Sequence, residues 1–166
     1  ANLVIARIPT ASVSDVLKKR ILAEVTVLRS LYYFELVRLF GNVPLILKQI
    51  NSDDDYWNIP QTPKQEDYNQ IEGDIARVWA DLPTSVSGGE RGRITQGAAK
   101  AILGKIYLYD NKKAEAAAQF ADVNGTPGQT SQYGYKLVGN YSSLWTTDNK
   151  FTSESILEAV HTNAGM

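Results

Sequence analysis

The sequence predicts a mainly α protein in which tetratricopeptide-like helical hairpins stack as an α-α superhelix, with little β structure near the C-terminus. Three observations support this prediction. Apolar residues recur every third or fourth position from about residue 15 to residue 40, which is the period of a helix. A second helical pattern covers residues 62–82, and two shorter ones follow each other over residues 95–123.

Composition favours one folded unit. The chain has 166 residues, of which 43% are hydrophobic, so it can bury the core of a single domain over residues 1–166. The 17 basic and 18 acidic side chains give a net charge of −1, which offers no basic surface to nucleic acid or to an anionic membrane. We therefore expect no nucleic-acid partner. The sequence has no cysteine, which excludes thiol nucleophiles and thiolate metal sites.

The first nine residues predict the end of a helix that stops before Pro9. They contain neither an initiator methionine nor the basic and apolar regions of a signal peptide. A helix that is open at residue 1, together with a strand-like segment over residues 155–160, suggests an excerpt of a longer protein.

The long helix is predicted to begin at Ser12 or Ser14, either of which can cap it, and to run to about Phe40. Gly41 can adopt the left-handed backbone of a helix stop, and Pro44 prevents continuation. One apolar stripe keeps the helical spacing throughout, namely Leu17, Ile21, Val25, Leu28, Tyr32, Leu36 and Leu39. A second row widens this face beyond what one neighbour could cover, so the C-terminal half should be packed from two sides; it contains Leu22, Tyr33, Val37 and Phe40.

The next helix is predicted to follow an irregular loop over residues 51–63. Thr62 would be its N-cap, Pro63 its first residue and Gln65 the partner that closes a capping box. Its inward face would contain Tyr68, Ile71, Ile75, Val78, Trp79 and Leu82.

The patterns over residues 95–123 fit one tetratricopeptide repeat, with Thr95 capping the first helix. Gly104 and Ala116 are small where two helices must approach closely, and large or aromatic residues occupy the expected positions Leu103, Tyr107 and Phe120. Only one clear repeat is visible, whereas a solenoid needs about three, so neighbouring helices must supply the remaining burial.

Two features that could bind ions or phosphates each lack a required part. Counted from Asp53, an EF-hand would need glycine at Asn58 and glutamate at Lys64. A different ion site and a solvated acidic loop both remain open for residues 53–55. The glycine-rich segment 88–93 is not followed by the Gly-Lys-Ser/Thr of a phosphate loop. We expect no metal and no cofactor.

Catalysis has little support in the sequence. His161 is the single histidine, and no serine lies in a Gly-x-Ser-x-Gly elbow. Glycoside hydrolysis would need a carboxylate pair, but most acids are predicted on the polar sides of helices, including Glu72, Asp74, Asp81 and Glu115. We expect a protein that is not an enzyme.

Aromatic residues provide the candidate binding site. Six of them lie on helical stripes and are predicted core: Tyr32, Tyr33, Phe34, Trp79, Tyr107 and Phe120. Tyr56 and Trp57 instead lie in the irregular loop beside Asn58, where rings can stack on a sugar and an amide can bind its hydroxyls. The alternative, that Trp57 packs the loop onto the helices, is equally open. Trp145 is predicted to be a packing anchor.

Four separated stretches resemble the SusD/RagB family, in the family's order. The long-helix signature of that family is similar to Glu24, Leu28-Arg29, Tyr32-Tyr33-Phe34, residues 36–41 and Val43-Pro44-Leu45. The start of its tetratricopeptide-like pair resembles Gly92-Arg93, Thr95, Gly97-Ala98-Ala99 and residues 106–109. The following turn resembles Tyr135-Lys136-Leu137 with Asn140-Tyr141, and an earlier helix end resembles residues 1–5.

The resemblance implies a surface-exposed lipoprotein of the cell outer membrane that binds a nutrient, an oligosaccharide or else a peptide. It implies a SusC-like TonB-dependent transporter as partner, and membrane attachment only through an N-terminal lipid anchor that this chain does not contain. The family's binding aromatics match no segment here, so Tyr56, Trp57 and Asn58 are proposed from the residues alone. The alternative function is a tetratricopeptide-type protein-protein interaction module.

Overall fold

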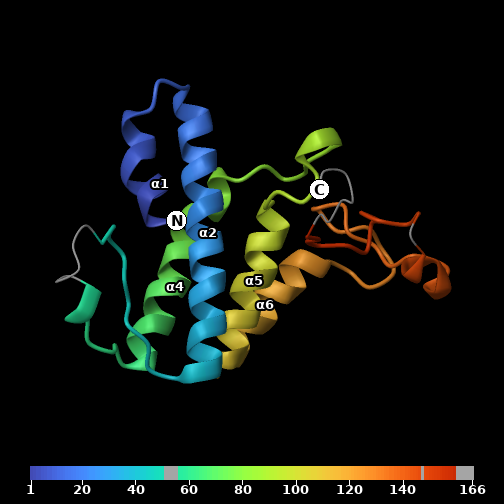
Figure 1. Cartoon of the computed structure of the whole chain (residues 1–166). Coiled ribbons are helices and arrows are strands. Elements are labelled where there is room, and N and C mark those ends of the chain that lie inside the picture. The colour runs from blue at the N-terminus through green and yellow to red at the C-terminus, as the bar shows by residue number, and fades with distance from the viewer. Residues whose placement is uncertain (51–55, 147, 160–166) are drawn as a thin grey trace.

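The computed structural model describes residues 1–50, 56–146 and 148–159. Four α-helices dominate it: α2 (Asp15–Phe40), α4 (Lys64–Val78), α5 (Gln96–Tyr109) and α6 (Lys113–Asn124). The short helix α1 (Asn2–Arg7) lies beside the N-terminal half of α2 (Figure 1). Four 3-10 turns complete the described helical structure: η1 (Ile8–Thr10), η2 (Trp79–Asp81), η3 (Gly88–Glu90) and η4 (Tyr141–Trp145).

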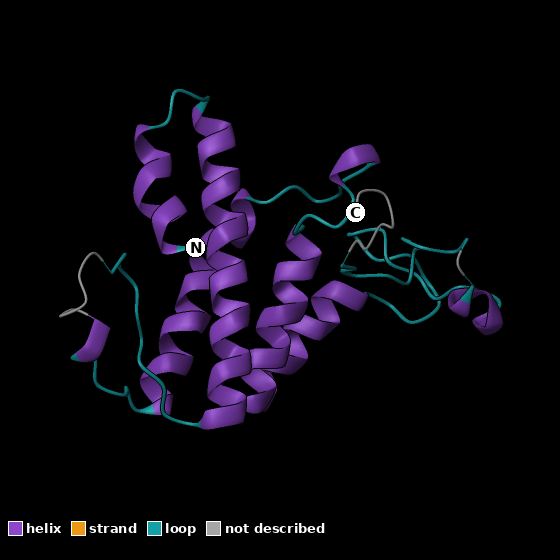
Figure 2. Ribbon diagram, viewed as in Figure 1, coloured by secondary structure: helices purple, strands orange, loops and turns teal. Residues whose placement is uncertain are grey.

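The mainly α prediction is confirmed. No β-strand occurs within the described ranges (Figure 2); they contain one isolated bridge, between Val43 and Thr62. Residues 155–160 are predicted as a short strand or an extended segment; as far as residue 159 no strand forms, and the stretch is an irregular segment. The residues just before it are held against the loop at 136–138, where Lys136 N donates to Ser153 O over 2.8 Å and Val138 N donates to Glu154 Oε2 over 3.0 Å.

Local signals set the ends of α2 and α5. Ser14 Oγ accepts a hydrogen bond from Leu17 N at 3.3 Å, and Thr95 Oγ1 accepts one from Ala98 N at 3.3 Å. Gly41 ends α2 with φ +74°, a conformation that a side chain would disfavour. These predicted caps and stops are confirmed.

The predicted start of α4 is wrong. The helix begins at Lys64, whose backbone N–H donates to the Asn42 side chain over 3.0 Å. Thr62 does not cap it, because the Thr62 hydroxyl accepts from Leu45 N at 3.3 Å. Gln65 closes no capping box and donates to Asp110 instead. Long-range contacts across the loop therefore replace the local cap.

The tetratricopeptide-like hairpin is present in the predicted register. Leu103, Gly104 and Ala116 are buried where α5 packs on α6, and Tyr107 and Phe120 are half-buried. On its other side α5 shares a core with α2 and α4. Among the described residues, the largest fully buried apolar side chains of this shared core are Phe34, Ile71, Ile75 and Ile106.

Helix α2 uses a different face for the core than the sequence predicts. The buried face carries Ala23, Thr26, Val27, Ser30, Phe34 and Val37. The predicted stripe lies on the opposite side, and its second half is exposed together with Phe40: Leu28, Tyr32, Leu36, Leu39 and Phe40, called here the outer stripe. The core prediction is therefore wrong for Tyr32, which is 68% exposed, whereas it is confirmed for Phe34. The expected packing from two sides is not present within the described residues.

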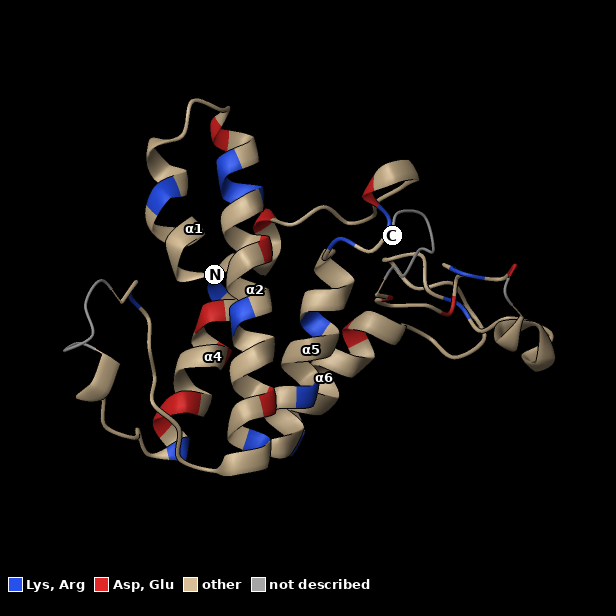
Figure 3. Cartoon of the chain, viewed as in Figure 1, with Lys and Arg blue, Asp and Glu red and all other residues tan. Residues whose placement is uncertain are grey.

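Charges of both signs are interspersed over the helices (Figure 3). Glu72 and Asp74 were predicted on a solvated face, but both are buried and ion-paired. Glu72 bonds Lys112 at 2.5 Å, and Asp74 bonds Arg29 at 2.6 Å. Asp81 and Glu115 are exposed, as predicted. The two buried acids thus join helices.

Candidate ligand-binding surface

The loop that carries the candidate site is fixed at its base. Thr62 N donates to Val43 O over 2.9 Å, which closes the loop where it leaves α2 and enters α4. One step further out, the Tyr33 hydroxyl accepts from Ile46 N at 2.7 Å and donates to Ile46 O at 3.1 Å. Burial raises the pKa of Tyr33, so this hydroxyl stays protonated and keeps both bonds. The loop therefore leaves the helices from a defined position.

Tyr56 and Trp57 form an exposed aromatic pair on a short helical turn of this loop. Their ring centroids are 5.2 Å apart and their planes meet at 87°, an edge-to-face contact. Trp57 is 78% exposed and Tyr56 59% exposed, so the indole does not pack onto the helices that the structure describes. Asn58 follows in a turn and is also exposed. The arrangement presents flat apolar surface beside an amide group.

A hollow of about 460 Å³ lies along the preceding part of the same loop. Its lining runs from Leu45 to Ile50 and includes Ile59, two residues after Trp57. Asn2 Nδ2 helps to hold this wall by donating to Ile46 O over 2.7 Å and to Lys48 O over 3.1 Å. Aliphatic side chains and backbone groups of the same loop therefore form a hollow whose lining comes within two residues of Trp57 in the sequence.

A second exposed aromatic pair is one that the sequence analysis missed. Tyr141 and Trp145 lie on η4 with ring centroids 5.8 Å apart, and they are 69% and 74% exposed. The prediction that Trp145 is a packing anchor is therefore wrong for this chain. The turn is held by local hydrogen bonds, including Ser142 N to Asn140 Oδ1 at 3.1 Å. The sequence signal that could have indicated this pair is the spacing of four residues between Tyr141 and Trp145. The two pairs lie on opposite sides of the helices (Figure 1).

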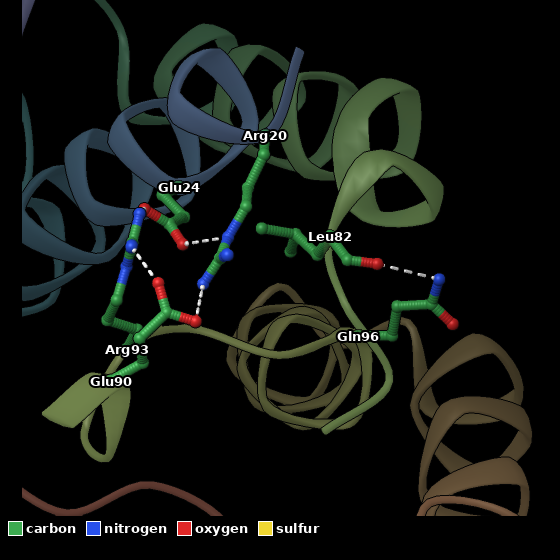
Figure 4. Close-up of polar contacts among 6 residues, drawn as sticks. All are labelled: Arg20, Glu24, Leu82, Glu90, Arg93 and Gln96. Carbon is green, nitrogen blue, oxygen red and sulfur yellow. Dashed lines mark hydrogen bonds and ion pairs between the residues drawn. The ribbon is translucent and has the colours of Figure 1, made fainter. Parts of the chain in front are cut away.

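The glycine-rich segment 88–93 forms part of an ion-pair cluster (Figure 4). Arg93 bonds Glu24 of α2 and Glu90 at 2.6 Å each, and Arg20 bonds Glu24 and Glu90 at 3.1 Å each. The hydrogen bond that Arg93 donates to Glu24 raises the pKa of Arg93, and the hydrogen bond that Arg20 donates to Glu90 lowers the pKa of Glu90. Arg93, a cation that could have met a phosphate, is thus already neutralised by two carboxylates.

Other candidate features are limited by what the structure describes. Residues 53–55 and His161 lie outside the described residues. Within them, no group of three or more histidine or acidic residues is placed to hold a metal ion. Nor does the described part of the chain contain a helix with both the length and the apolar character needed to cross a membrane.

Comparison with known proteins gives consistent matches. A family model for SusD-like proteins, described as starch-binding and associating with the outer membrane, matches residues 1–108. A SusD-like protein of Bacteroides ovatus is 30% identical over 175 residues, covering 95% of this chain and 30% of that protein. A laminarin binding SusD-like protein is 47% identical with a TM-score of 0.95, covering 98% of this chain and 35% of that one.

A further solved structure contains a xylogluco-oligosaccharide. It is 26% identical with a TM-score of 0.75, and the match covers 94% of this chain and 32% of that one. The chain spans only 26% and 30% of the length of the two curated relatives that it matches. These relatives are therefore much longer than this chain of 166 residues.

Proposed function

Because the chain belongs to the family of SusD-like starch-binding proteins that associate with the outer membrane, we propose that it is part of a protein that binds a nutrient glycan without transforming it. The 166 residues are one helical domain of a longer protein. That protein is a surface lipoprotein, held by a lipid anchor outside this chain, and it delivers its ligand to a SusC-like TonB-dependent transporter.

The observation that carries this proposal is the likeness to the laminarin binding SusD-like protein, at 47% identity over 98% of this chain. The neighbour with a xylogluco-oligosaccharide supports the same class of ligand. A glycan chain presents flat apolar ring faces between hydroxyl groups, and exposed aromatics with nearby amides suit both. We propose Tyr56, Trp57 and Asn58 as a contact site within this domain.

The proposal is tested by calorimetry of the full-length protein. The ligands are laminarin, xyloglucan and starch oligosaccharides, with a set of peptides as the alternative nutrient. Saturable heat with one glycan class and no new product by chromatography is the expected result. Release of shorter sugars would identify an enzyme instead, and saturation by peptides alone would change the ligand class.

The tetratricopeptide-like hairpin of α5 and α6 favours one second function, a protein-interaction module. In that case the full-length protein binds a protein partner and none of the glycans. Calorimetry without any glycan response, together with stable capture of the transporter, would favour this function over nutrient binding.

A further inference from the structure

The side chain of Asn2 links helix α1 to the wall of the candidate binding loop. Its Nδ2 group donates two hydrogen bonds, to Ile46 O over 2.7 Å and to Lys48 O over 3.1 Å. Both acceptors belong to the segment 45–50 that lines the hollow of about 460 Å³. The two bonds span 44 and 46 positions of the sequence, so they hold the loop against a helix that is far from it along the chain.

The oxygen of the same amide faces the largely buried cation of Arg29. Arg29 Nη1 donates to Asn2 Oδ1 over 3.1 Å, while Arg29 Nη2 donates to Asp74 of α4 over 2.6 Å. A guanidinium group can only donate, so it holds the amide oxygen toward itself and leaves the NH2 group turned toward the two loop carbonyls. The side chains of Arg29 and Asp74 are 11% and 2% exposed. The orientation of Asn2 is therefore set from within the packed helices.

The arm of the loop that leaves α2 and the arm that enters α4 lie together. At the base, Thr62 N of the second arm donates to Val43 O of the first over 2.9 Å. Further out, Ile59 of the second arm lines the same hollow as residues 45–50 of the first. Trp57 precedes Ile59 by two residues. The first arm is thus part of the support against which the arm with the aromatic pair is placed.

We propose that Asn2 is a positioning residue for glycan binding, whose two hydrogen bonds hold the loop so that Tyr56 and Trp57 are in place to meet the ligand. This inference rests on the proposed function and adds to it a cause of affinity away from the contact surface. Asparagine suits the role because its amide both accepts and donates. Holding a loop in its bound position before the ligand arrives lowers the entropy cost of binding. Loss of the two bonds should therefore weaken binding although no contact to the glycan is removed.

Asn2→Asp separates positioning from stability. The carboxylate keeps an acceptor for Arg29 and adds an opposite charge, but it cannot donate to the carbonyls of Ile46 and Lys48. Its second oxygen would face these carbonyl oxygens and repel them. In the full-length protein the melting temperature should stay within a few degrees, while the Kd for the glycan rises at least about fivefold. Without ligand, amide hydrogen exchange at Ile46 should become at least about fivefold faster.

The matched control is Asn69→Asp. Asn69 is exposed on α4, and its side chain accepts a hydrogen bond from Gln65 of the same helix. The same charge change at this position should alter neither glycan affinity nor exchange at Ile46. A double-mutant cycle with Trp57→Ala then tests the route of the effect. If Asn2 acts through the loop, Asn2→Asp should weaken binding by the Trp57→Ala protein less than about twofold.

The outcomes distinguish this inference from the function on which it rests. If the unmodified protein binds a glycan but Asn2→Asp keeps its affinity, or keeps its exchange rate at Ile46, the inference is wrong and the proposed function stands. An equal loss of affinity with and without Trp57 shows that Asn2 acts elsewhere, and a melting temperature many degrees lower in Asn2→Asp shows a structural role. Either result overturns the inference alone. If the unmodified protein binds no glycan, both are wrong.

Discussion

Gly104 of α5 lies against the ring of Phe120 of α6. A Cβ atom on Gly104 would stand 2.8 Å from Phe120 Cε1 and 3.1 Å from Gln119 Cβ, both closer than van der Waals contact. The hydrogen atom of glycine therefore sets how closely the two helices of the hairpin approach. The buried residues of α6 are Ala116 and Val123, so the half-buried Phe120 ring against Gly104 adds to the packing of the hairpin.

Gly104→Ala should destabilise the protein. Alanine gains about 1 kcal/mol of helix propensity, but overpacking costs about 1–3 kcal/mol, so a net loss of about 1 kcal/mol is expected in urea unfolding. Gly73→Ala is the matched control, because Gly73 lies inside α4 and, apart from the backbone of its own helix and its chain neighbours, no atom lies within 4 Å of an added Cβ. It should stabilise by up to about 1 kcal/mol. Equal effects of the two variants would show that the hairpin can open without cost.

Arg29→Ala should cost about 3 kcal/mol of unfolding free energy, because it leaves the buried carboxylate of Asp74 without its buried partner. The two side chains are 11% and 2% exposed and meet at 2.6 Å. Arg77 pairs with the same carboxylate but is 69% exposed. Arg77→Ala should therefore change stability by less than about 1 kcal/mol. A larger loss for Arg77→Ala than for Arg29→Ala, measured by the same denaturant titration, would contradict this account.

Asp67→Asn should make the protein more stable at neutral pH. Asp67 is fully buried in the first turns of α4, and its oxygens have no hydrogen-bond partner within the described residues. Burial raises the pKa of Asp67 and outweighs the nearby backbone N–H of Val43, which acts in the opposite direction but does not reach hydrogen-bond geometry. A raised folded pKa gives stability that is present below the ordinary aspartate pKa and is lost as pH rises through the raised value.

Over that pH window the unfolding free energy of the unmodified protein should fall relative to Asp67→Asn, which cannot titrate. At pH 7 the variant should be more stable by about 1 kcal/mol. Glu66→Gln, at the exposed neighbouring position, serves as the control and should track the unmodified protein. Parallel curves for all three proteins would show that Asp67 is not strained by burial.

Helix boundaries could be predicted where the signal is local. Ser14, Gly41 and Thr95 act on backbone groups within a few residues, so the sequence alone contains the cause. The start of α4 could not be predicted, because its cap is Asn42, which lies 22 residues away. The sequence contains a local capping box, but the Thr62 hydroxyl accepts a hydrogen bond from Leu45 N across the loop and so does not cap the helix.

The core face of α2 could not be predicted because the helix is apolar on more than one side. Periodicity identifies a stripe, but it does not say which neighbour will cover it. The buried face of α2 carries the small residues Ala23 and Ser30, and α2 packs on α4 and α5, so the less hydrophobic side became the core. For the candidate site, too, the sequence does not say which aromatic side chains will be covered by a neighbour. Exposure of Tyr56 and Trp57 agrees with a binding surface, whereas the exposure of Trp145 was not foreseen.

Trp57→Ala should weaken glycan binding by the full-length protein while leaving its melting temperature within a few degrees. A stacking indole is an anchor whose loss costs about 1–3 kcal/mol, or at least about fivefold in affinity. Stability should change little because the side chain is 78% exposed.

Trp145→Ala is a closely matched control, since Trp145 is 74% exposed and also meets a tyrosine edge to face. Calorimetry and thermal unfolding of both variants separate the outcomes. If Trp57→Ala binds normally but unfolds many degrees lower, Trp57 supports the loop and the binding surface lies elsewhere. If Trp145→Ala alone loses affinity, the glycan contacts η4 and the assignment to Tyr56, Trp57 and Asn58 is wrong.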